Sequence, residues 1–271
     1  VLVWEKSKGK YNSLISVLKT IRKSKFDRVI NAQRFASSGI FTALSGAKTK
    51  IGFDKNPLTF LFTKTVKHSF DGRHEIERNH DLLEPILPPN TPVEKPRLYP
   101  SPNDFARVSE FQNKTFRCIA PTSVWFTKQW PKEKWADLIN LIPAEETIYL
   151  LGAKADLAPC SEIKSLANRG NVKILAGELN LLESAALMSK ASMNYVNDSA
   201  PMHLASAMNA PTTVIFCSTV PSFGFGPLSD NQKLAETAEK LDCRPCGVHG
   251  RSKCPQGHFK CASTIKPESV L

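Results

Sequence analysis

Short apolar runs rich in β-branched residues alternate along the chain with segments of helical period, and this alternation constrains the fold more than any other feature. The runs predicted as strands are residues 1–4, 28–31, 50–53, 117–120, 147–151, 172–175, 193–196 and 212–216. The segments predicted as helices are residues 11–23, 35–44, 75–84, 132–142, 156–168, 181–189 and 200–208. Such alternation is typical of parallel sheets with helices on both faces, so the predicted fold class is α/β.

Prolines crowd residues 85–102 and indicate a boundary between two domains. We expect an N-terminal Rossmann-like domain over residues 1–95 and a C-terminal one over residues 103–271. The N-terminal domain has too few predicted strands for a complete doubly wound sheet. The chain also begins at Val1, without a methionine and inside a predicted strand. We therefore expect the N-terminal domain to be truncated and incomplete.

The positive charge gathers in the first third of the chain. Residues 1–80 hold 16 Lys or Arg against 6 Asp or Glu, which is +10 of the net charge of +11. A basic region suits nucleic acid, an anionic membrane surface or a phosphorylated substrate, and it equally suits a solvated face. The longest stretch without Asp, Glu, Lys or Arg, residues 199–229, holds four prolines, which argues against a membrane helix. No signal peptide is evident, so we expect a cytoplasmic protein with only peripheral membrane contact.

Residues 197–203, Asn-Asp-Ser-Ala-Pro-Met-His, follow a predicted strand and open a predicted helix. Asp198 or Ser199 can cap this helix, and Pro201 suits its first turn. The N-terminus of a helix presents N–H groups and the positive end of the helix dipole, which together bind anions. In open α/β sheets, ligands sit beyond the carboxyl ends of the strands, where this turn falls. His203 faces the same anion if it lies in the first turn; the alternative is a structural helix with a core histidine.

A second loop of the same kind follows the predicted strand 117–120. Its sequence over residues 121–131, Pro-Thr-Ser-Val-Trp-Phe-Thr-Lys-Gln-Trp-Pro, places several hydroxyl groups and Lys128 before a helix opened by Pro131. Hydroxyls and one ammonium at the end of a strand suit a diphosphate. The alternative is a loop with packed tryptophans and a solvated lysine, but two such loops in one domain favour a phosphate site.

Motifs for several other kinds of site are absent from the sequence. No two aspartates are separated by one residue, so there is no Asp-x-Asp metal clamp, and neither Gly-x-Gly-x-x-Gly nor a Walker loop occurs. Gly-x-Ser-x-Gly is also absent, which leaves a hydrolase nucleophile elbow without support. We therefore expect phosphate charge to be met by the helix dipole, hydroxyls and Lys128.

Together the two motifs resemble those of glycosyltransferase family 9, the bacterial ADP-heptose:lipopolysaccharide heptosyltransferases. The matching residues are Pro121, Ser123, Trp125, Thr127, Lys128, Trp130 and Pro131 in the first motif and residues 197–203 in the second. The stretch 224–228 (Gly-Phe-Gly-Pro-Leu) and the C-terminal cysteine pattern are similar as well, and the resemblance covers nearly the whole chain. The resemblance implies a GT-B fold, which has two Rossmann-like domains with the donor bound mainly to the second. It also implies that the transfer reaction needs no metal ion.

The resemblance also implies roles for particular side chains. Ser123 and Lys128 are expected to contact the donor diphosphate. The donor pocket is expected to be lined by Asp198 towards the sugar, Ser199 towards the phosphate, and His203. The family's general base is an aspartate in a Gly-Asp motif after the first strand, and this chain has no such motif. Inverting transfer needs that carboxylate to take the proton of the acceptor hydroxyl. The catalytic base is thus unknown and expected ahead of the chain's first residue, so we expect weak donor binding and little turnover.

Acceptor recognition belongs to the N-terminal domain in this family, and that domain carries the excess charge. The expected acceptor is lipopolysaccharide core or lipid A, reached by peripheral contact with the inner membrane. The candidate acceptor-binding residues are Arg34, Lys48, Lys50, Lys55, Arg73 and Arg78. The sequence His74-Glu75-x-x-Arg78 is similar to a family feature that opens a helix; its alternative is a capped helix with an exposed ion pair.

The cysteines fall into two groups. The residues predicted to be isolated core thiols, as in a reducing cytosol, are Cys118, Cys160 and Cys217. The C-terminal group consists of Cys243, Cys246, Cys254 and Cys261, with His249 and His258 nearby. Four thiolates can form a tetrahedral structural zinc site, but the second pair lacks the usual zinc spacing. Structural zinc, disulfides and free thiols stay as alternatives.

The leading hypothesis is an inverting glycosyltransferase that moves a sugar, heptose from ADP-heptose, onto lipopolysaccharide core without a required cofactor. One alternative is a nucleotide-sugar epimerase of the same fold, for which no supporting acidic motif is evident. Another is a non-catalytic module that binds nucleotides or nucleic acid, suggested by the basic charge. Binding to a mononucleotide-sugar but not to duplex DNA at moderate salt favours the transferase, because binding to a phosphate backbone falls steeply with salt. The transferase hypothesis includes no nucleic-acid partner.

Overall fold

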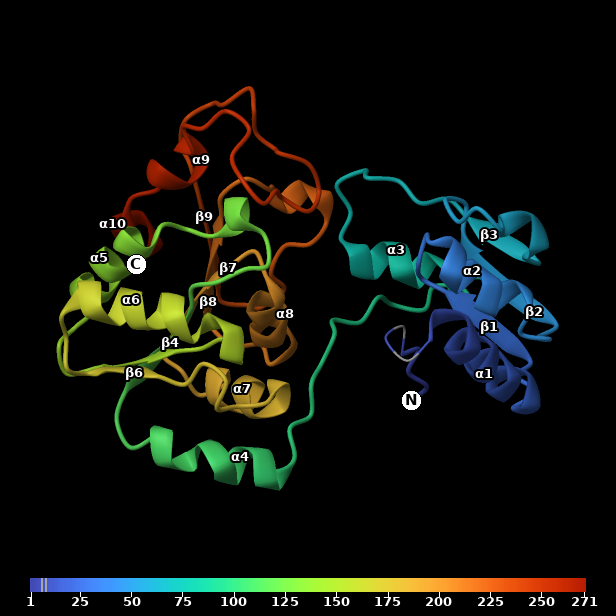
Figure 1. Cartoon of the computed structure of the whole chain (residues 1–271), viewed down its shortest axis with the longest axis horizontal. Helices are drawn as coiled ribbons and strands as arrows, with labels where there is room; N and C mark the ends of the chain where they lie inside the picture. The colour runs from blue at the N-terminus through green and yellow to red at the C-terminus, as the bar shows by residue number, and fades with distance from the viewer. Residues whose placement is uncertain (6, 8) are drawn as a thin grey trace. The chain divides into compact units, whose positions relative to one another are not determined.

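The computed structural model describes residues 1–5, 7 and 9–271 and consists of two compact units, Val1–Glu94 and Lys95–Leu271. Each unit is built on a parallel sheet with helices packed against it (Figure 1). Within the described residues, no helix combines the length and the apolar character that crossing a membrane requires. The predicted α/β fold class is confirmed.

The unit Val1–Glu94 holds a three-stranded parallel sheet in the order β1-β2-β3. Its strands are β1 (Arg28–Asn31), β2 (Thr49–Phe53) and β3 (Lys64–Val66). Its helices are α1 (Lys10–Lys23), α2 (Ala36–Ala43) and α3 (Glu75–Asp81). The core is small: Ile51, Phe53 and Leu82 are buried together, and Val66 and Ile86 pack against them.

The strand predicted over residues 1–4 is wrong. Residues 1–5 form no helix or strand, and no ladder partner is described for them. A strand needs a partner for its backbone N–H and C=O groups, which apolar side chains alone do not provide. Trp4 instead packs edge-on against Phe41 of α2, with ring centroids 5.7 Å apart.

The unit Lys95–Leu271 holds a six-stranded parallel sheet in the order β6-β5-β4-β7-β8-β9. Its strands are β4 (Phe116–Ala120), β5 (Thr147–Leu150), β6 (Val172–Ile174), β7 (Met193–Asn197), β8 (Thr212–Phe216) and β9 (Gln232–Glu236). Its helices are α4 (Pro102–Val108), α5 (Lys132–Leu141), α6 (Leu157–Ala167), α7 (Leu181–Met188), α8 (Ala200–Ala207), α9 (Lys260–Ser263) and α10 (Pro267–Val270). The chain steps outwards from β4 to β6 and then returns to place β7 beside β4. The strand order therefore reverses between β4 and β7, as in a Rossmann-like doubly wound sheet.

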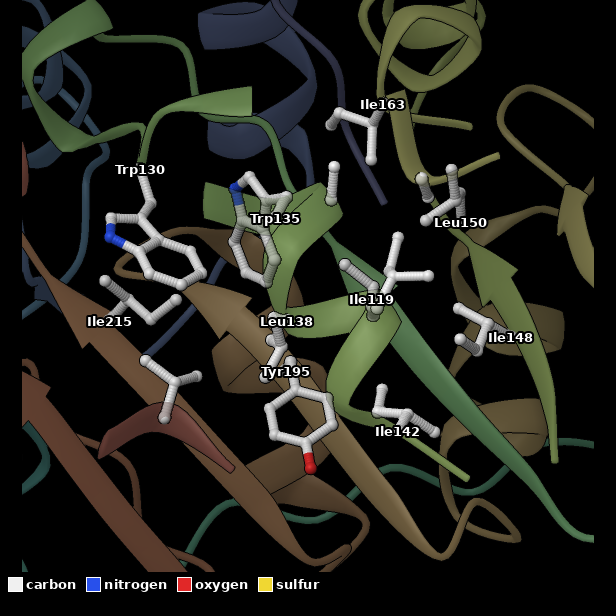
Figure 2. Packing of buried hydrophobic residues seen from close by; sticks show 14 of the residues in the cluster. Ile119, Trp130, Trp135, Leu138, Ile142, Ile148, Leu150, Ile163, Tyr195 and Ile215 are labelled. Carbon is white, nitrogen blue, oxygen red and sulfur yellow. The ribbon is translucent and has the colours of Figure 1, made fainter. Parts of the chain in front are cut away.

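Helices cover both faces of this sheet (Figure 1). On one face, with α5, α6 and α10, Trp130 and Trp135 meet edge to face with ring centroids 5.1 Å apart (Figure 2). On the other face, with α4, α7 and α8, the core includes Cys118 and Met202. Consecutive residues of β4, Cys118 and Ile119, belong to opposite faces, as the two-residue period of a strand requires. A hydrophobic core therefore packs against each face of the six-stranded sheet.

The structure also contains elements that the sequence pattern does not predict: β3, β9, α4, α9 and α10. α4 begins inside the proline-rich stretch that was expected to be a linker. A capping box starts it, because the Ser101 hydroxyl accepts the Asp104 N–H and the Asp104 carboxylate accepts the Ser101 N–H. β9 shows no clear hydrophobic period because most of its side chains are exposed.

Candidate functional site

The two loops singled out by the sequence meet where the strand order of the larger unit reverses. One loop follows β4 and the other follows β7, and these strands are neighbours. Asn197 joins the loops: its fully buried side chain donates to the Pro121 carbonyl at 2.7 Å and accepts the Trp130 N–H at 3.1 Å. Open α/β sheets bind ligands beyond the carboxyl ends of strands at such a switch point. Asn197 is therefore a positioning residue for the whole site.

Lys128 and Asp198, one from each loop, form an ion pair at this edge of the sheet. Lys128 Nζ lies 2.7 Å from Asp198 Oδ2, and the Thr219 hydroxyl donates to the same oxygen at 2.6 Å. The two side chains are 14% and 8% exposed, so water screens their attraction much less than that of a surface pair. The ammonium expected to meet a diphosphate is thus held in place, with its charge balanced by Asp198.

α8 begins at the same edge, and no side chain in the described part of the chain caps its N-terminus. Ser199 occupies the N-cap position, but its hydroxyl donates to the Asn197 carbonyl at 3.3 Å instead of accepting a helix N–H. The prediction that Asp198 or Ser199 caps the helix is confirmed for the position, which Ser199 occupies. Neither side chain makes the capping hydrogen bond, because the Ser199 hydroxyl donates to Asn197 and the Asp198 carboxylate pairs with Lys128. Pro201 lies in the first turn, as predicted. The N–H groups and dipole at this terminus suit an anion.

A cavity of about 320 Å³ opens between these groups. Lys128, Asp198, Ser199 and His203 all line it, so the structure brings four of the five predicted donor-binding residues together. Ser123 is not among the lining residues. Its carbonyl accepts a hydrogen bond from the Gln129 side chain at 2.7 Å within the loop after β4. The cavity volume falls in the range of sites for small ligands.

Two further segments complete the cavity, and neither belongs to the two motifs that mark the site in the sequence. Val220, Phe223 and Phe225 line it from the loop after β8. Val248 and His249 line it from a segment near the C-terminus. Apolar walls with a few polar groups are usual for small-molecule sites. The charge-free stretch 199–229 contains the first three residues and is a usable signal for them, whereas no sequence pattern marks Val248.

In the smaller unit, two of the arginines expected to meet an acceptor lie at the surface. Arg34 is exposed, and its guanidinium lies 5.7 Å from the centre of the Phe70 ring. Arg73 pairs with two carboxylates, at 2.9 Å from Asp81 and 3.1 Å from Asp71. The hydrogen bond to Asp81, and after it the one to Asp71, raises the pKa of Arg73. The acceptor-binding roles of Arg34 and Arg73 stay predictions.

Arg78 is an interior residue of the smaller unit. It is 0% exposed, its Nε pairs with Glu75 at 2.8 Å, and its Nη1 donates to the Arg73 carbonyl at 2.6 Å. Before it, His74 caps α3 by accepting an N–H through Nδ1, and Glu77 accepts the His74 N–H at 2.6 Å. Arg78 therefore does not form an exposed ion pair, because its own unit encloses the guanidinium in this structure. Its acceptor-binding role stays a prediction.

The cysteines are free thiols in the structure. The three predicted core thiols, Cys118, Cys160 and Cys217, are buried, as expected, and burial raises the pKa of Cys160 to about 12. Across the described residues, no three His, Cys, Asp or Glu side chains are arranged to hold a metal ion. Among the described residues, Cys243, Cys246, Cys254 and Cys261 are therefore not arranged as a zinc site, and structural zinc at these cysteines stays untested. Cys261 is buried in α9, while the other three thiols lie half-buried in the loop before it.

Comparison with known proteins places the chain in a family. Residues 14–253 match the model of glycosyltransferase family 9 (heptosyltransferase). The chain is 27% identical to lipopolysaccharide heptosyltransferase 3 of Escherichia coli over 240 residues, which cover 83% of this chain and 69% of that protein. It is 28% identical to lipooligosaccharide heptosyltransferase 2 of Campylobacter jejuni over 147 residues, which cover 53% of this chain and 44% of that protein.

Solved structures share the fold. The structure of E. coli ADP-heptose lipopolysaccharide heptosyltransferase II superposes with a TM-score of 0.77 at 19% identity, covering 96% of this chain and 78% of that one. E. coli heptosyltransferase WaaC with ADP gives a TM-score of 0.71 at 18% identity, covering 98% of this chain and 78% of that one. The fold is that of the GT-B heptosyltransferases. Because the family model matches most of its residues, the chain belongs to glycosyltransferase family 9.

Proposed function

We propose that this chain transfers heptose from ADP-heptose to the core of lipopolysaccharide by an inverting, metal-independent reaction. The observation that carries the proposal is the Lys128–Asp198 pair beside the N-terminus of α8, in a chain of family 9. The two relatives described above are named as heptosyltransferases of lipopolysaccharide and lipooligosaccharide. One structure with the same fold is of a heptosyltransferase with ADP.

The donor diphosphate is proposed to bind at the N-terminus of α8. Backbone N–H groups there and the helix dipole favour an anion. A phosphate oxygen that enters the cavity competes with Asp198 for the Lys128 ammonium, which lies 2.7 Å from the carboxylate. Once the ammonium turns to the phosphate, Asp198 can accept a hydrogen bond from a sugar hydroxyl. This exchange gives Lys128 a phosphate contact and Asp198 a sugar contact.

The leaving ADP is proposed to be stabilised without a metal ion. Negative charge that develops on the leaving phosphate is met by Lys128 and by the fixed N–H groups of α8, which need no rearrangement at the moment of reaction. The sequence has no Asp-x-Asp clamp for a divalent cation. Inversion requires the acceptor hydroxyl to attack from the face opposite ADP while a carboxylate takes its proton. No residue of this chain is assigned to that carboxylate.

The unit Val1–Glu94 is proposed to meet the acceptor. Residues 1–80 carry +10 of the chain's net charge, and lipopolysaccharide core is anionic. Long-range attraction of this sign raises the local concentration of an anionic substrate and favours peripheral contact with an anionic membrane surface. Arg34 and Arg73 are the proposed contacts, and the proposal includes no nucleic-acid partner.

Product analysis tests the proposed function. The chain is incubated with ADP-heptose and a heptose-accepting lipopolysaccharide core in EDTA, and UDP-sugars serve as competing donors. We expect slow formation of an acceptor heavier by one heptose, because no residue of this chain is assigned to the base that takes the acceptor proton. The new bond is expected to have the anomeric configuration opposite to that of the donor. Transfer with retained configuration, transfer only with a divalent cation, or transfer from the UDP-sugars alone would overturn the proposal.

A pair of lysine variants locates the activity in the cavity. Lys128→Met removes the ammonium that lines it, whereas Lys132→Met removes an exposed ammonium that pairs with Glu162. We expect Lys128→Met to slow transfer by at least about tenfold, since hydrogen bonds to charged groups are worth about 1.5–3 kcal/mol. Lys132→Met is expected to transfer heptose at the normal rate. Equal transfer rates for the two variants would contradict the proposal that Lys128 binds the donor diphosphate.

A further inference from the structure

A segment near the C-terminus supplies part of the donor cavity. Residues 243–251, called here the C-terminal wall, form no helix or strand and contribute Val248 and His249 to the cavity lining. This segment has no role in the proposed function. How firmly the wall is attached decides whether His249 is held at the cavity.

One end of the C-terminal wall is bound to the backbone that follows β8. The Arg244 guanidinium donates to the carbonyl of Cys217 at 2.7 Å and to that of Thr219 at 2.8 Å. The Cys246 N–H donates to the Ser218 carbonyl at 2.8 Å. These bonds fix the wall to the same loop that carries the apolar lining of the cavity.

The other end is bound to the loop after β4. The Thr127 N–H donates to the Arg251 carbonyl at 3.0 Å, and the Arg251 N–H donates to the Thr127 hydroxyl at 2.8 Å. The Ser218 hydroxyl donates to the same Thr127 oxygen at 3.0 Å. Thr127 is 1% exposed, so water does not compete for these bonds. The wall is therefore anchored on both sides of His249.

Gly250 shows how closely the wall approaches Lys128. Its φ is +77°, a conformation that residues with a side chain rarely adopt. A Cβ at this position would lie 2.9 Å from Lys128 Cγ and 3.2 Å from Thr127 Oγ1. The backbone next to His249 thus lies against the stem of the lysine that lines the cavity. Glycine is therefore favoured at position 250 for two reasons: its backbone adopts a positive φ, and a Cβ would collide with Lys128.

The ionisable side chains of the cavity offer little net positive charge to a diphosphate. In the described part of the chain, the ionisable side chains that line it are Lys128, Asp198, His203 and His249. Lys128 and Asp198 balance each other, so further donors must help to hold a ligand with two or more negative charges. A histidine offers at least one N–H donor in either protonation state. His203 comes from α8, and His249 comes from the C-terminal wall.

We propose that His249 is a donor-binding residue, which donates a hydrogen bond to the diphosphate of the nucleotide-sugar. The proposal rests on the proposed function, because it concerns the same cavity. It assigns to the C-terminal wall a direct part in ligand binding beside its packing. His258, which follows the wall, is exposed, lies 3.8 Å from Cys243 Sγ and does not line the cavity. It is therefore the matched control.

Calorimetric titration of the whole chain tests the proposal, with ADP and adenosine as probes in EDTA. We expect His249→Ala to weaken ADP binding about tenfold, as for the loss of one charge-assisted hydrogen bond, and to leave adenosine binding unchanged. His249→Gln keeps an N–H donor and is expected to retain part of the ADP affinity. His258→Ala is expected to bind both ligands like the unaltered chain. Thermal melting of each variant verifies that the fold is kept.

The outcomes separate this proposal from the function on which it rests. If the unaltered chain binds ADP and His249→Ala binds it equally well, His249 makes no contact and the proposal is overturned alone. Equal weakening of ADP and adenosine, or equal weakening by His258→Ala, would also overturn it, because the effect would then come from loosening of the segment. If the unaltered chain binds no ADP, the proposed function is overturned and this proposal with it.

Discussion

The two units of this chain hold their charged side chains in different ways. In Lys95–Leu271, a six-stranded sheet with a core on each face brings Lys128 and Asp198 to a cavity. In Val1–Glu94, a three-stranded sheet with a small core places Arg78 against Glu75. A charge that faces a cavity is available to a ligand, whereas a charge that is paired and enclosed within its own unit is not. The charge excess of residues 1–80 therefore overstates the charge offered to an acceptor.

Asn197→Ala is expected to have the largest effect, and it acts on the larger unit. The change removes the buried amide that serves the Pro121 carbonyl and the Trp130 N–H. A buried group left unsatisfied costs about 1–3 kcal/mol, so we expect the free energy of unfolding to fall by about 3 kcal/mol and ADP binding to be lost. Urea unfolding and calorimetry measure the two effects.

The matched control for this change is Asn113→Ala. It removes an exposed amide that donates to the Glu110 carbonyl, and we expect it to alter the free energy of unfolding by less than about 0.5 kcal/mol. If Asn197→Ala lowered the free energy of unfolding no more than this control, other contacts would hold the loops after β4 and β7. The assigned role of Asn197 in positioning Lys128 and Asp198 would then be contradicted.

Arg78→Ala against Arg34→Ala tests the same contrast within the smaller unit. Arg78 is 0% exposed and donates to Glu75 and to the Arg73 carbonyl, so its removal is expected to lower the free energy of unfolding by about 2 kcal/mol. Arg34 is exposed, and its removal is expected to leave stability within about 0.5 kcal/mol while weakening binding to lipopolysaccharide. Urea unfolding and a vesicle-binding assay distinguish the two. A stable Arg78→Ala with reduced acceptor binding would contradict the structural role of Arg78.

Glu146→Gln is expected to have a smaller effect that depends on pH. Arg117 pairs with both carboxylate oxygens of Glu146, at 2.8 and 2.9 Å, and these hydrogen bonds hold the pKa of Glu146 below 4.5 although burial opposes them. A depressed folded-state pKa means that the stabilisation is present above the ordinary carboxyl pKa and is lost as the pH falls through the folded value.

We therefore expect Glu146→Gln to cost about 1 kcal/mol of unfolding free energy at neutral pH and progressively less below pH ~4. Donor affinity should not change, because Glu146 is not among the residues that line the cavity. Glu110→Gln, which removes an exposed partner of Arg107, is the control. A penalty that stays constant from neutral to acidic pH would contradict the assigned cause of the pKa shift.

The strands and helices of the larger unit were largely predictable because strong local signals mark them. β8 was predicted with its observed bounds, Thr212–Phe216, since all of its residues are buried and its neighbours are turn-forming. The loops after β4 and β7 were recognisable because each joins a buried strand to a helix. The sequence also contained the signal for α4, a Ser-Pro-x-Asp start, which the surrounding prolines obscured.

The features that were missed depend on which segments become neighbours in space. The Lys128–Asp198 pair exists because β4 lies beside β7, and a local pattern does not contain that strand order. Arg78 is buried by its unit, although the same helix sequence suits an exposed ion pair. His249 reaches the cavity from a segment without helix or strand, where no periodicity is available to read.

Amide chemical-shift mapping of the chain during titration with ADP in EDTA tests the central claim most directly, namely that the larger unit holds the donor at the N-terminus of α8. We expect the largest shifts at the amides of Ser199, Ala200 and His203 and at Lys128, with saturation at a single site. Small or absent shifts are expected in Val1–Glu94. Shifts centred in Val1–Glu94, or none at the N-terminus of α8, would contradict the claim.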